Sequence, residues 1–243
     1  MRREIQSWHS PNLNKQMEIV SYGHFGFALL MFPTAGEDYL EYERFGLIDS
    51  IKSFIEEGKL KAFSVNTINN ESWLNEHVPP SYRALRHQQY NQYIVEEVIP
   101  FIRNSTSQET MIIATGVSLG ALLAANVFFR RPDIFGGMIV MSGSYDIKPY
   151  ADGYYDDNCY FNNPVDYLPN LTDESILAQL RSKPHIYILS GQGDYEAPER
   201  SVQLAQILEA KGIPCHLDLW GHDIPHDWPA WRAMLPHVLR TRF

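Results

Sequence analysis

The sequence predicts an α/β protein with a mostly parallel central sheet, antiparallel strands at its N-terminal end and helices on both faces. Apolar runs of strand length alternate with longer segments of helical period almost throughout the chain. The first two segments, Glu4 to Trp8 and Gln16 to Tyr22, alternate apolar and polar residues, which is typical of antiparallel strands with one face in water. The next segment, Phe27 to Phe32, is apolar throughout and is expected to be covered on both faces.

The remaining elements continue the alternation. Expected helices are Phe45 to Leu60, Tyr82 to Ile102, Leu119 to Arg130, Pro198 to Lys211 and Trp228 to Arg240, and expected strands are Lys61 to Val65, Met111 to Thr115, Gly136 to Met141, Ile186 to Leu189 and His216 to Trp220. Pro100 should kink or tighten the last turn of the second helix, because it lacks an N–H group and crowds the carbonyl of Glu96.

Composition is that of an ordinary folded domain. The chain has 243 residues, of which 44% are hydrophobic and 20% charged, and it contains no repeat or Gly/Ser-rich linker. A chain of this length can bury roughly 70–75% of its unfolded surface, so one core is feasible. We therefore expect a single domain spanning residues 1–243.

Charge and hydropathy exclude several partners. Twenty Lys and Arg against 29 Asp and Glu leave a formal charge of −9, which would repel a nucleic-acid backbone. The longest apolar runs are far shorter than the roughly 20 residues that cross a bilayer, and the first residues lack the apolar core of a signal peptide. We expect a cytoplasmic protein without membrane or nucleic-acid partners, in which Cys159 and Cys215 are reduced thiols.

One stretch, Tyr145 to Asn170, breaks the rhythm. It is rich in tyrosine and aspartate and has no sustained period, so we expect a long irregular insertion. Its aromatic density argues for order. It either packs over the sheet or contacts substrate, and Tyr145 is a candidate for such contact.

The chemistry-bearing motif follows the strand that starts at Met111. Gly116-Val117-Ser118-Leu119-Gly120 has the G-x-S-x-G pattern, with an apolar strand before it and an apolar helix after it. The turn is so tight that side chains at Gly116 and Gly120 would collide with backbone. Ser118 is therefore the predicted nucleophile, with the helix N-terminus directed at the developing oxyanion.

A serine nucleophile needs a base, and the base needs an acid that orients it. The expected chain order is Ser, Asp or Glu, then His. Asp194 lies on a glycine-rich loop after a predicted strand and is the predicted acid, while Glu196 and Glu199 could substitute for it.

Two histidines, His222 and His226, follow the last strand, and either could reach Ser118. His226 is favoured because it stands just before the terminal helix, beside Trp228, an aromatic that could line the substrate site. A metal site at these histidines is not expected, because Pro225 spoils the helical register and no glutamate stands between them as in H-E-x-x-H.

The oxyanion hole requires two backbone N–H groups. One is that of Leu119, and the second should come from the loop after Phe32. Pro33 has no N–H, so Thr34 or Ala35 is the expected donor.

The chain resembles the esterase family of α/β-hydrolases that includes esterase D, feruloyl esterases, enterochelin esterases and mycolyltransferases. The resemblance spans nearly the whole chain and rests on Gly116 to Gly120, Gly191 to Asp194, and His226-Asp227-Trp228-Pro229-Ala230-Trp231-Arg232. In that family a histidine followed closely by tryptophan is the base, which decides for His226. The resemblance also implies an α/β-hydrolase fold, an acyl-serine intermediate, no cofactor, and often homodimers.

The predicted function is hydrolysis of small-molecule carboxylic esters by a serine esterase. The aromatic, acidic insertion favours neutral or aromatic acyl groups over anionic ones. The alternatives are an acyltransferase or thioesterase with the same triad, and a non-catalytic ligand-binding homologue, since a fold does not fix a function.

Overall fold

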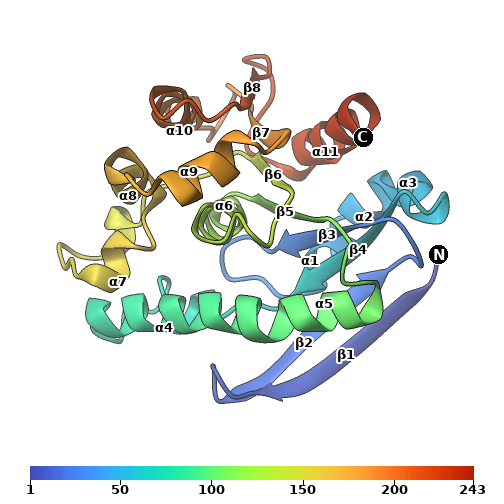
Figure 1. Ribbon diagram of the computed structural model, residues 1–243, viewed down its shortest axis with the longest axis horizontal. Helices are drawn as coiled ribbons and strands as arrows, with labels where there is room; N and C mark the ends of the chain where they lie inside the picture. The colour runs from blue at the N-terminus through green and yellow to red at the C-terminus, as the bar shows by residue number, and fades with distance from the viewer.

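Eight strands form one sheet in the order β1-β2-β4-β3-β5-β6-β7-β8 in the computed structural model, which describes residues 1–243 (Figure 1). The strands are β1 (Arg3–Ser10), β2 (Lys15–Tyr22), β3 (Phe27–Phe32), β4 (Leu60–Val65), β5 (Ile112–Val117), β6 (Gly137–Met141), β7 (His185–Ser190) and β8 (His216–Leu219). β2 pairs antiparallel with both β1 and β4, and every other neighbouring pair is parallel. The predicted antiparallel edge leading into a parallel sheet is thus confirmed.

Helices connect the strands. They are α1 (Glu41–Arg44), α2 (Leu47–Ser50), α3 (Lys52–Glu56), α4 (Pro80–Tyr93), α5 (Ile99–Ser105), α6 (Leu119–Arg130), α7 (Asp157–Tyr160), α8 (Pro164–Asn170), α9 (Glu174–Arg181), α10 (Pro198–Ala210) and α11 (Trp228–Arg242), with 3₁₀ turns η1 (Asn69–Glu71) and η3 (Lys148–Tyr150) and the π-helical turn η2 (Ile94–Val98). α9 was not among the elements expected from the sequence.

Both faces of the sheet are covered. On one face α4, α5, α6, α8, α9 and α10 pack against alternate residues of the central strands, such as Leu30 and Ala114. On the other face α1, α2, α3 and α11 cover the intervening residues, such as Leu29 and Ile113 (Figure 1). This two-sided burial explains why the central strands are apolar throughout.

Two predicted helices are interrupted. The expected helix from Phe45 to Leu60 is split into short helices, because Gly46 adopts a left-handed conformation with φ 73° at the start of α2. The long helix beginning at α4 widens into η2 before Pro100, which cannot donate to the carbonyl of Glu96. The sequence predicted a kinked or tightened last turn at Pro100, whereas the structure has a wider π-helical turn just before this residue.

The segment Tyr145 to Asn170 is less irregular than expected, since it forms η3, α7 and α8. A buried asparagine, Asn162, holds it to the helices beneath: its Oδ1 accepts from Asn126 Nδ2 at 2.8 Å and from Arg130 Nη1 at 3.2 Å. Because polar side-chain contacts hold this segment, its short helices lack the apolar periodicity by which helices are predicted from sequence. Cys159 in α7 is buried, and both cysteines are free.

Candidate active site

Ser118 lies on the sharp turn between β5 and α6. Its φ of 55° and ψ of −121° place it in a sparsely populated backbone region. A Cβ atom on Gly116 would lie 2.2 Å from the carbonyl oxygen of Gly120, and a Cβ on Gly120 would lie 2.1 Å from that of Phe32. The two glycines are thus required by backbone contacts across the turn, and Ser118 is left partly exposed.

The loops that follow the parallel strands meet at one edge of the sheet. The Ser118 N–H donates to the carbonyl of Met141 at the end of β6 at 3.1 Å, and the Ser142 N–H donates to Leu189 in β7 at 2.8 Å. His226 follows β8, the next strand in the sheet. Polar residues far apart in sequence therefore gather at the carboxyl ends of neighbouring strands, where α/β proteins place their sites.

His226 faces Glu196. The imidazole Nδ1 lies 3.5 Å from Glu196 Oε2, which is long for a hydrogen bond, and it has no other polar partner. The ring packs edge to face on Trp231 with centroids 5.0 Å apart, and 25% of the side chain is exposed. By contrast, His222 is exposed and its side chain makes no hydrogen bond.

Glu196 is almost fully enclosed, with only 1% of its side chain exposed. It accepts hydrogen bonds from Ser142 Oγ at 2.5 Å and Ser190 Oγ at 3.1 Å, and Trp231 Nε1 donates to Ser142 Oγ at 3.0 Å. Burial raises the pKa of Glu196, but the contacts with His226, Ser142 and Ser190 outweigh burial and lower it overall. The carboxylate is therefore held ionised.

Asp194, the predicted acid, does not bring its carboxylate to His226 in the structure. The carboxylate of Asp194 is exposed and makes no hydrogen bond, and only its backbone carbonyl contacts His226, by accepting from the N–H at 2.9 Å. The loop after β7 turns at Tyr195, which has a left-handed φ of 64°, and this turn brings Glu196 inward instead. The order of residues in the sequence does not reveal that the chain reverses direction at Tyr195, although the sequence analysis named Glu196 as an alternative acid.

Thr34 and Ala35, the two candidates for the second oxyanion-hole N–H group, differ in whether that group is already hydrogen-bonded. Thr34 N–H donates to Glu41 Oε2 at 2.8 Å, so it is already occupied. Ala35 is exposed and its N–H donates no hydrogen bond. Leu119 opens α6, and the first four N–H groups of a helix have no acceptor within it. Leu119 and Ala35 are thus the available pair.

Trp228 and Tyr145, the two aromatic residues predicted to contact substrate, differ in their exposure. Trp228 is half-buried and stacks on Phe45, with ring centroids 4.5 Å apart and an interplanar angle of 2°. Tyr145, the other residue predicted to contact substrate, is only 1% exposed, because its ring packs under the backbone of Gly143. No hydrogen bond joins Ser118 to His226, and catalytic hydrogen bonds in unliganded enzymes are often long.

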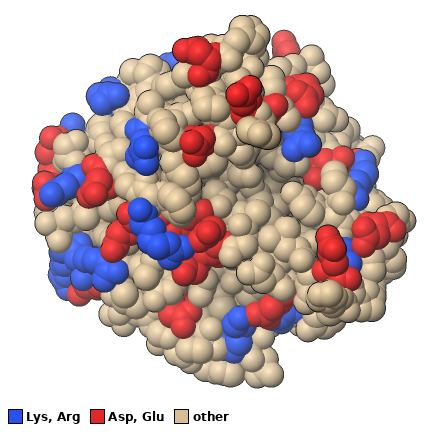
Figure 2. Space-filling view, turned by 180° about the vertical axis from the view of Figure 1, so that it is seen from behind, with Lys and Arg blue, Asp and Glu red and all other residues tan.

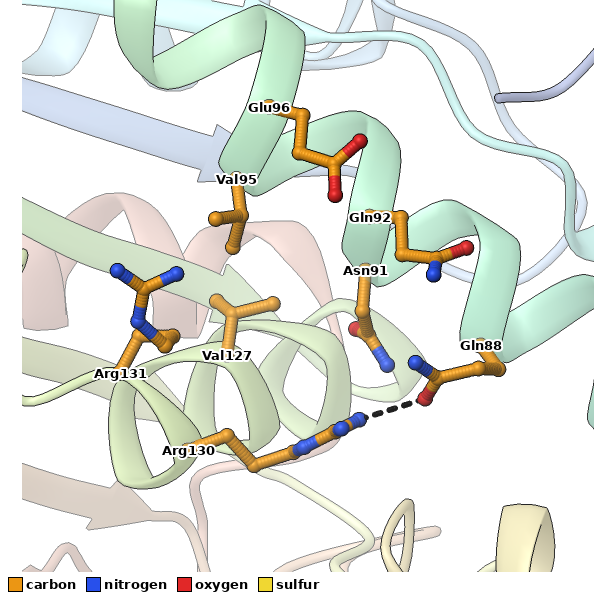
Figure 3. A pocket seen from close by; sticks show the side chains of 8 residues that line it. All are labelled: Gln88, Asn91, Gln92, Val95, Glu96, Val127, Arg130 and Arg131. Atoms are coloured by element: carbon orange, nitrogen blue, oxygen red, sulfur yellow. Dashed lines mark hydrogen bonds between the residues drawn. The ribbon is translucent and has the colours of Figure 1, made fainter.

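A separate pocket of about 180 Å³ lies between α4 and α6 (Figure 3). Arg130 lines it and donates to Gln88 Oε1 at 2.8 Å. Arg130 ends α6 whereas Ser118 precedes it, so about 18 Å of helix separates the two. This pocket does not belong to the site around Ser118.

The surface of the molecule carries charges of both signs. The face shown in Figure 2 carries acidic and basic side chains interspersed, without a continuous basic surface. No helix is both long enough and apolar enough to span a bilayer. No three His, Cys, Asp or Glu side chains come together in a way that could hold a metal ion.

The parallel sheet with a strained serine between β5 and α6 defines an α/β-hydrolase fold. A solved ferulic acid esterase matches with a TM-score of 0.76 and 19% identity, over 98% of this chain and 96% of that chain. S-formylglutathione hydrolases from Staphylococcus aureus (TM-score 0.70, 16% identity, 98% and 95% covered) and Agrobacterium tumefaciens (0.74, 13%, 98% and 93%) are also similar. These similarities show the fold.

The family follows from the sequence itself. The profile of the family described as Putative esterase matches residues 51–241. No curated protein matches. The chain belongs to this esterase family and is a carboxylic ester hydrolase, as the sequence motifs predicted.

Proposed function

We propose that this protein cleaves small-molecule carboxylic esters through an acyl-serine intermediate on Ser118, with His226 as the base and Glu196 as the acid that orients it. The observation that carries the proposal is the approach of Glu196 Oε2 to His226 Nδ1 at 3.5 Å, in the loops that flank the strained Ser118 turn. A proton on Nδ1 facing Glu196 leaves Nε2 free to accept the serine proton.

The first half of the cycle forms the acyl-enzyme. Ser118 Oγ attacks the ester carbonyl carbon while His226 Nε2 takes the hydroxyl proton. The carbonyl oxygen becomes an oxyanion, which the N–H groups of Leu119 and Ala35 stabilise. The tetrahedral intermediate then collapses, the bond to the alcohol oxygen breaks, and His226 returns its proton to the departing alcohol.

The second half releases the acid. Water attacks the acyl carbon as His226 takes its proton, and a second oxyanion forms in the same hole. The bond to Ser118 Oγ then breaks, and the proton on His226 returns to the serine. The cycle needs no cofactor. Trp228, which starts α11 just after the base and stacks on Phe45, is the aromatic side chain that we propose lines the substrate site.

Covalent labelling tests this proposal. A fluorophosphonate probe should attach to the wild-type protein at Ser118, and Ser118→Ala should abolish both labelling and hydrolysis of p-nitrophenyl acetate, with turnover falling by about 10⁴ to 10⁶. A Ser118→Ala protein that still turns over this ester would overturn the proposal.

A further inference from the structure

Glu41 in α1 is a buried acid that the proposed cycle does not use. The residue is 1% exposed. Its Oε2 accepts from the backbone N–H of Thr34 at 2.8 Å, and its Oε1 accepts from the Thr34 hydroxyl. A single carboxylate therefore takes both donors of one residue in the loop after β3, beside the proposed oxyanion donor Ala35.

Two further side chains, from Tyr42 and Asn69, hydrogen-bond the backbone carbonyls of the loop after β3. The hydroxyl of Tyr42, the neighbour of Glu41 in α1, donates to the carbonyl of Phe32. Asn69 Nδ2 donates to the carbonyl of Thr34 at 3.4 Å. Ala35 comes next, and its N–H has no partner within the chain. The contacts thus fix the peptide before Ala35 and leave the Ala35 N–H free.

The loop also touches the nucleophile turn. A Cβ atom on Gly120 would lie 2.5 Å from the carbonyl oxygen of Pro33, so the chain just before Thr34 packs directly on the first turn of α6. An oxyanion donor must lie within about 3 Å of the developing charge, so small shifts of this loop would weaken catalysis.

We propose that Glu41 is a positioning residue for the oxyanion hole: by binding the N–H and hydroxyl of Thr34, it orients the peptide that carries the Ala35 N–H. The inference rests on the proposed function of Ser118. Glu41 acts through Thr34 and does not touch the substrate. Its role is to hold one donor in place before the reaction begins, which avoids reorganisation in the transition state.

The charge of Glu41 should matter for this role. The pKa of Glu41 is raised overall to about 7, chiefly by burial and with a smaller contribution from Glu37, although the hydrogen bonds from Thr34 and the charge of Arg44 oppose the shift. The phenol of Tyr42 also lies close to this carboxyl. When Glu41 is ionised, both of its oxygens accept hydrogen bonds, so they satisfy the N–H and the hydroxyl of Thr34. When Glu41 is protonated, one oxygen carries a hydrogen and becomes a poorer acceptor for Thr34. The contact with Thr34 should therefore strengthen as pH rises through 7.

The first test compares Glu41→Gln with Glu43→Gln. Glu43 lies in the same helix but pairs with Arg3 and Tyr22 on the outer strands. Glu41→Gln should lower kcat for p-nitrophenyl acetate by about 10-fold to 100-fold, somewhat less than complete loss of an oxyanion donor, with KM little changed. Glu43→Gln should stay within about twofold of wild type.

The pH profile separates Glu41 from the base. The ratio of wild-type to Glu41→Gln kcat/KM cancels the titration of His226, which both proteins share. This ratio should rise between pH 5.5 and 8.5 with a midpoint near the Glu41 pKa of about 7. A ratio that stays constant, or a Glu41→Gln enzyme as active as wild type, would overturn the inference.

Stability distinguishes positioning from support of the fold. Because the pKa of Glu41 is raised from 4.5, its ionisation opposes folding, and the stability it contributes is lost as pH rises through about 7. The Glu41→Gln side chain does not ionise and so avoids the cost of burying a charge. At pH 8 the variant should therefore have a free energy of unfolding equal to or higher than that of the wild type. A variant that loses activity together with stability would instead mark a structural role.

A readout independent of activity completes the test. The Thr34 amide proton in ¹⁵N-labelled protein should titrate with a midpoint near 7, and this titration should vanish in Glu41→Gln. If Ser118→Ala remained active while Thr34 still titrated, the proposed function would fail and the Glu41 contact would stand. If Thr34 did not titrate, the inference about Glu41 would fail whatever the activity.

Discussion

The carboxylate of Glu196 lies 3.5 Å from Nδ1 of His226, while that of Asp194, two residues earlier, points into solvent. Both acids follow β7, and both stand at the right place in the chain order for an α/β-hydrolase. What separates them is burial: Glu196 receives hydroxyl donors from Ser142 and Ser190, and Asp194 receives none. An acid that orients a base is most effective where water does not compete for it.

Exchanging the two acids for amides should give opposite results. Glu196→Gln should lower kcat/KM for an activated ester by about 10³ to 10⁴, because the amide cannot hold the imidazolium that forms on His226. Asp194→Asn, the matched control, should stay within about threefold of wild type, since its side chain makes no contact. The assay is steady-state hydrolysis of p-nitrophenyl acetate at pH 8. The reverse ranking would return the acid's role to Asp194.

The two histidines of the last loop offer a second paired comparison. His226→Ala should lower kcat by about 10⁴ to 10⁶, because no other group near Glu196 can take the serine proton. His222→Ala should leave kcat nearly unchanged, since its ring is exposed and unbonded. Circular dichroism of both variants would show that they fold. Equal losses in the two variants would contradict the assignment.

Gly120 should not tolerate a methyl group. In Gly120→Ala the new Cβ would meet the carbonyl oxygens of Phe32 and Pro33 at 2.1 and 2.5 Å. We expect a loss of at least about 3 kcal/mol in the free energy of unfolding, measured by urea denaturation.

Gly153→Ala is the control for that substitution. Gly153 has a left-handed φ of 79°, but a Cβ there meets nothing within 4 Å. Its cost should be limited to backbone strain of about 1 to 2 kcal/mol. If Gly120→Ala were no more destabilised than Gly153→Ala, the tight contact between the two loops would be absent in solution.

Acid should selectively remove the contribution of Glu196 to stability. Because its pKa is lowered from 4.5 in the folded protein, the group stabilises the fold above that value, and this contribution is lost as pH falls through the folded pKa. The difference in unfolding free energy between wild type and Glu196→Gln should therefore be largest near pH 7 and shrink below about 4.5. Urea titrations from pH 7 to pH 3 measure it. A difference that did not change with pH would show that the contacts of Glu196 do not favour its ionised form.

The sequence by itself determined the sheet and the nucleophile turn. A continuous apolar run such as Phe27 to Phe32 predicts a strand that is buried between two layers of helices. The glycines on either side of Ser118 predict the tight turn, because a side chain at either position would collide with backbone. The same patterns could not show that the helix beginning near Phe45 breaks at Gly46, because apolar spacing does not report a left-handed residue.

Only the tertiary structure decided which acid faces His226 and which N–H after β3 is free. Asp194 and Glu196 differ by a single left-handed turn at Tyr195, and Thr34 differs from Ala35 by a contact with Glu41 in a separate helix. Such choices depend on hydrogen bonds between segments that are distant or reversed in the chain, and hydrophobic periodicity does not encode them.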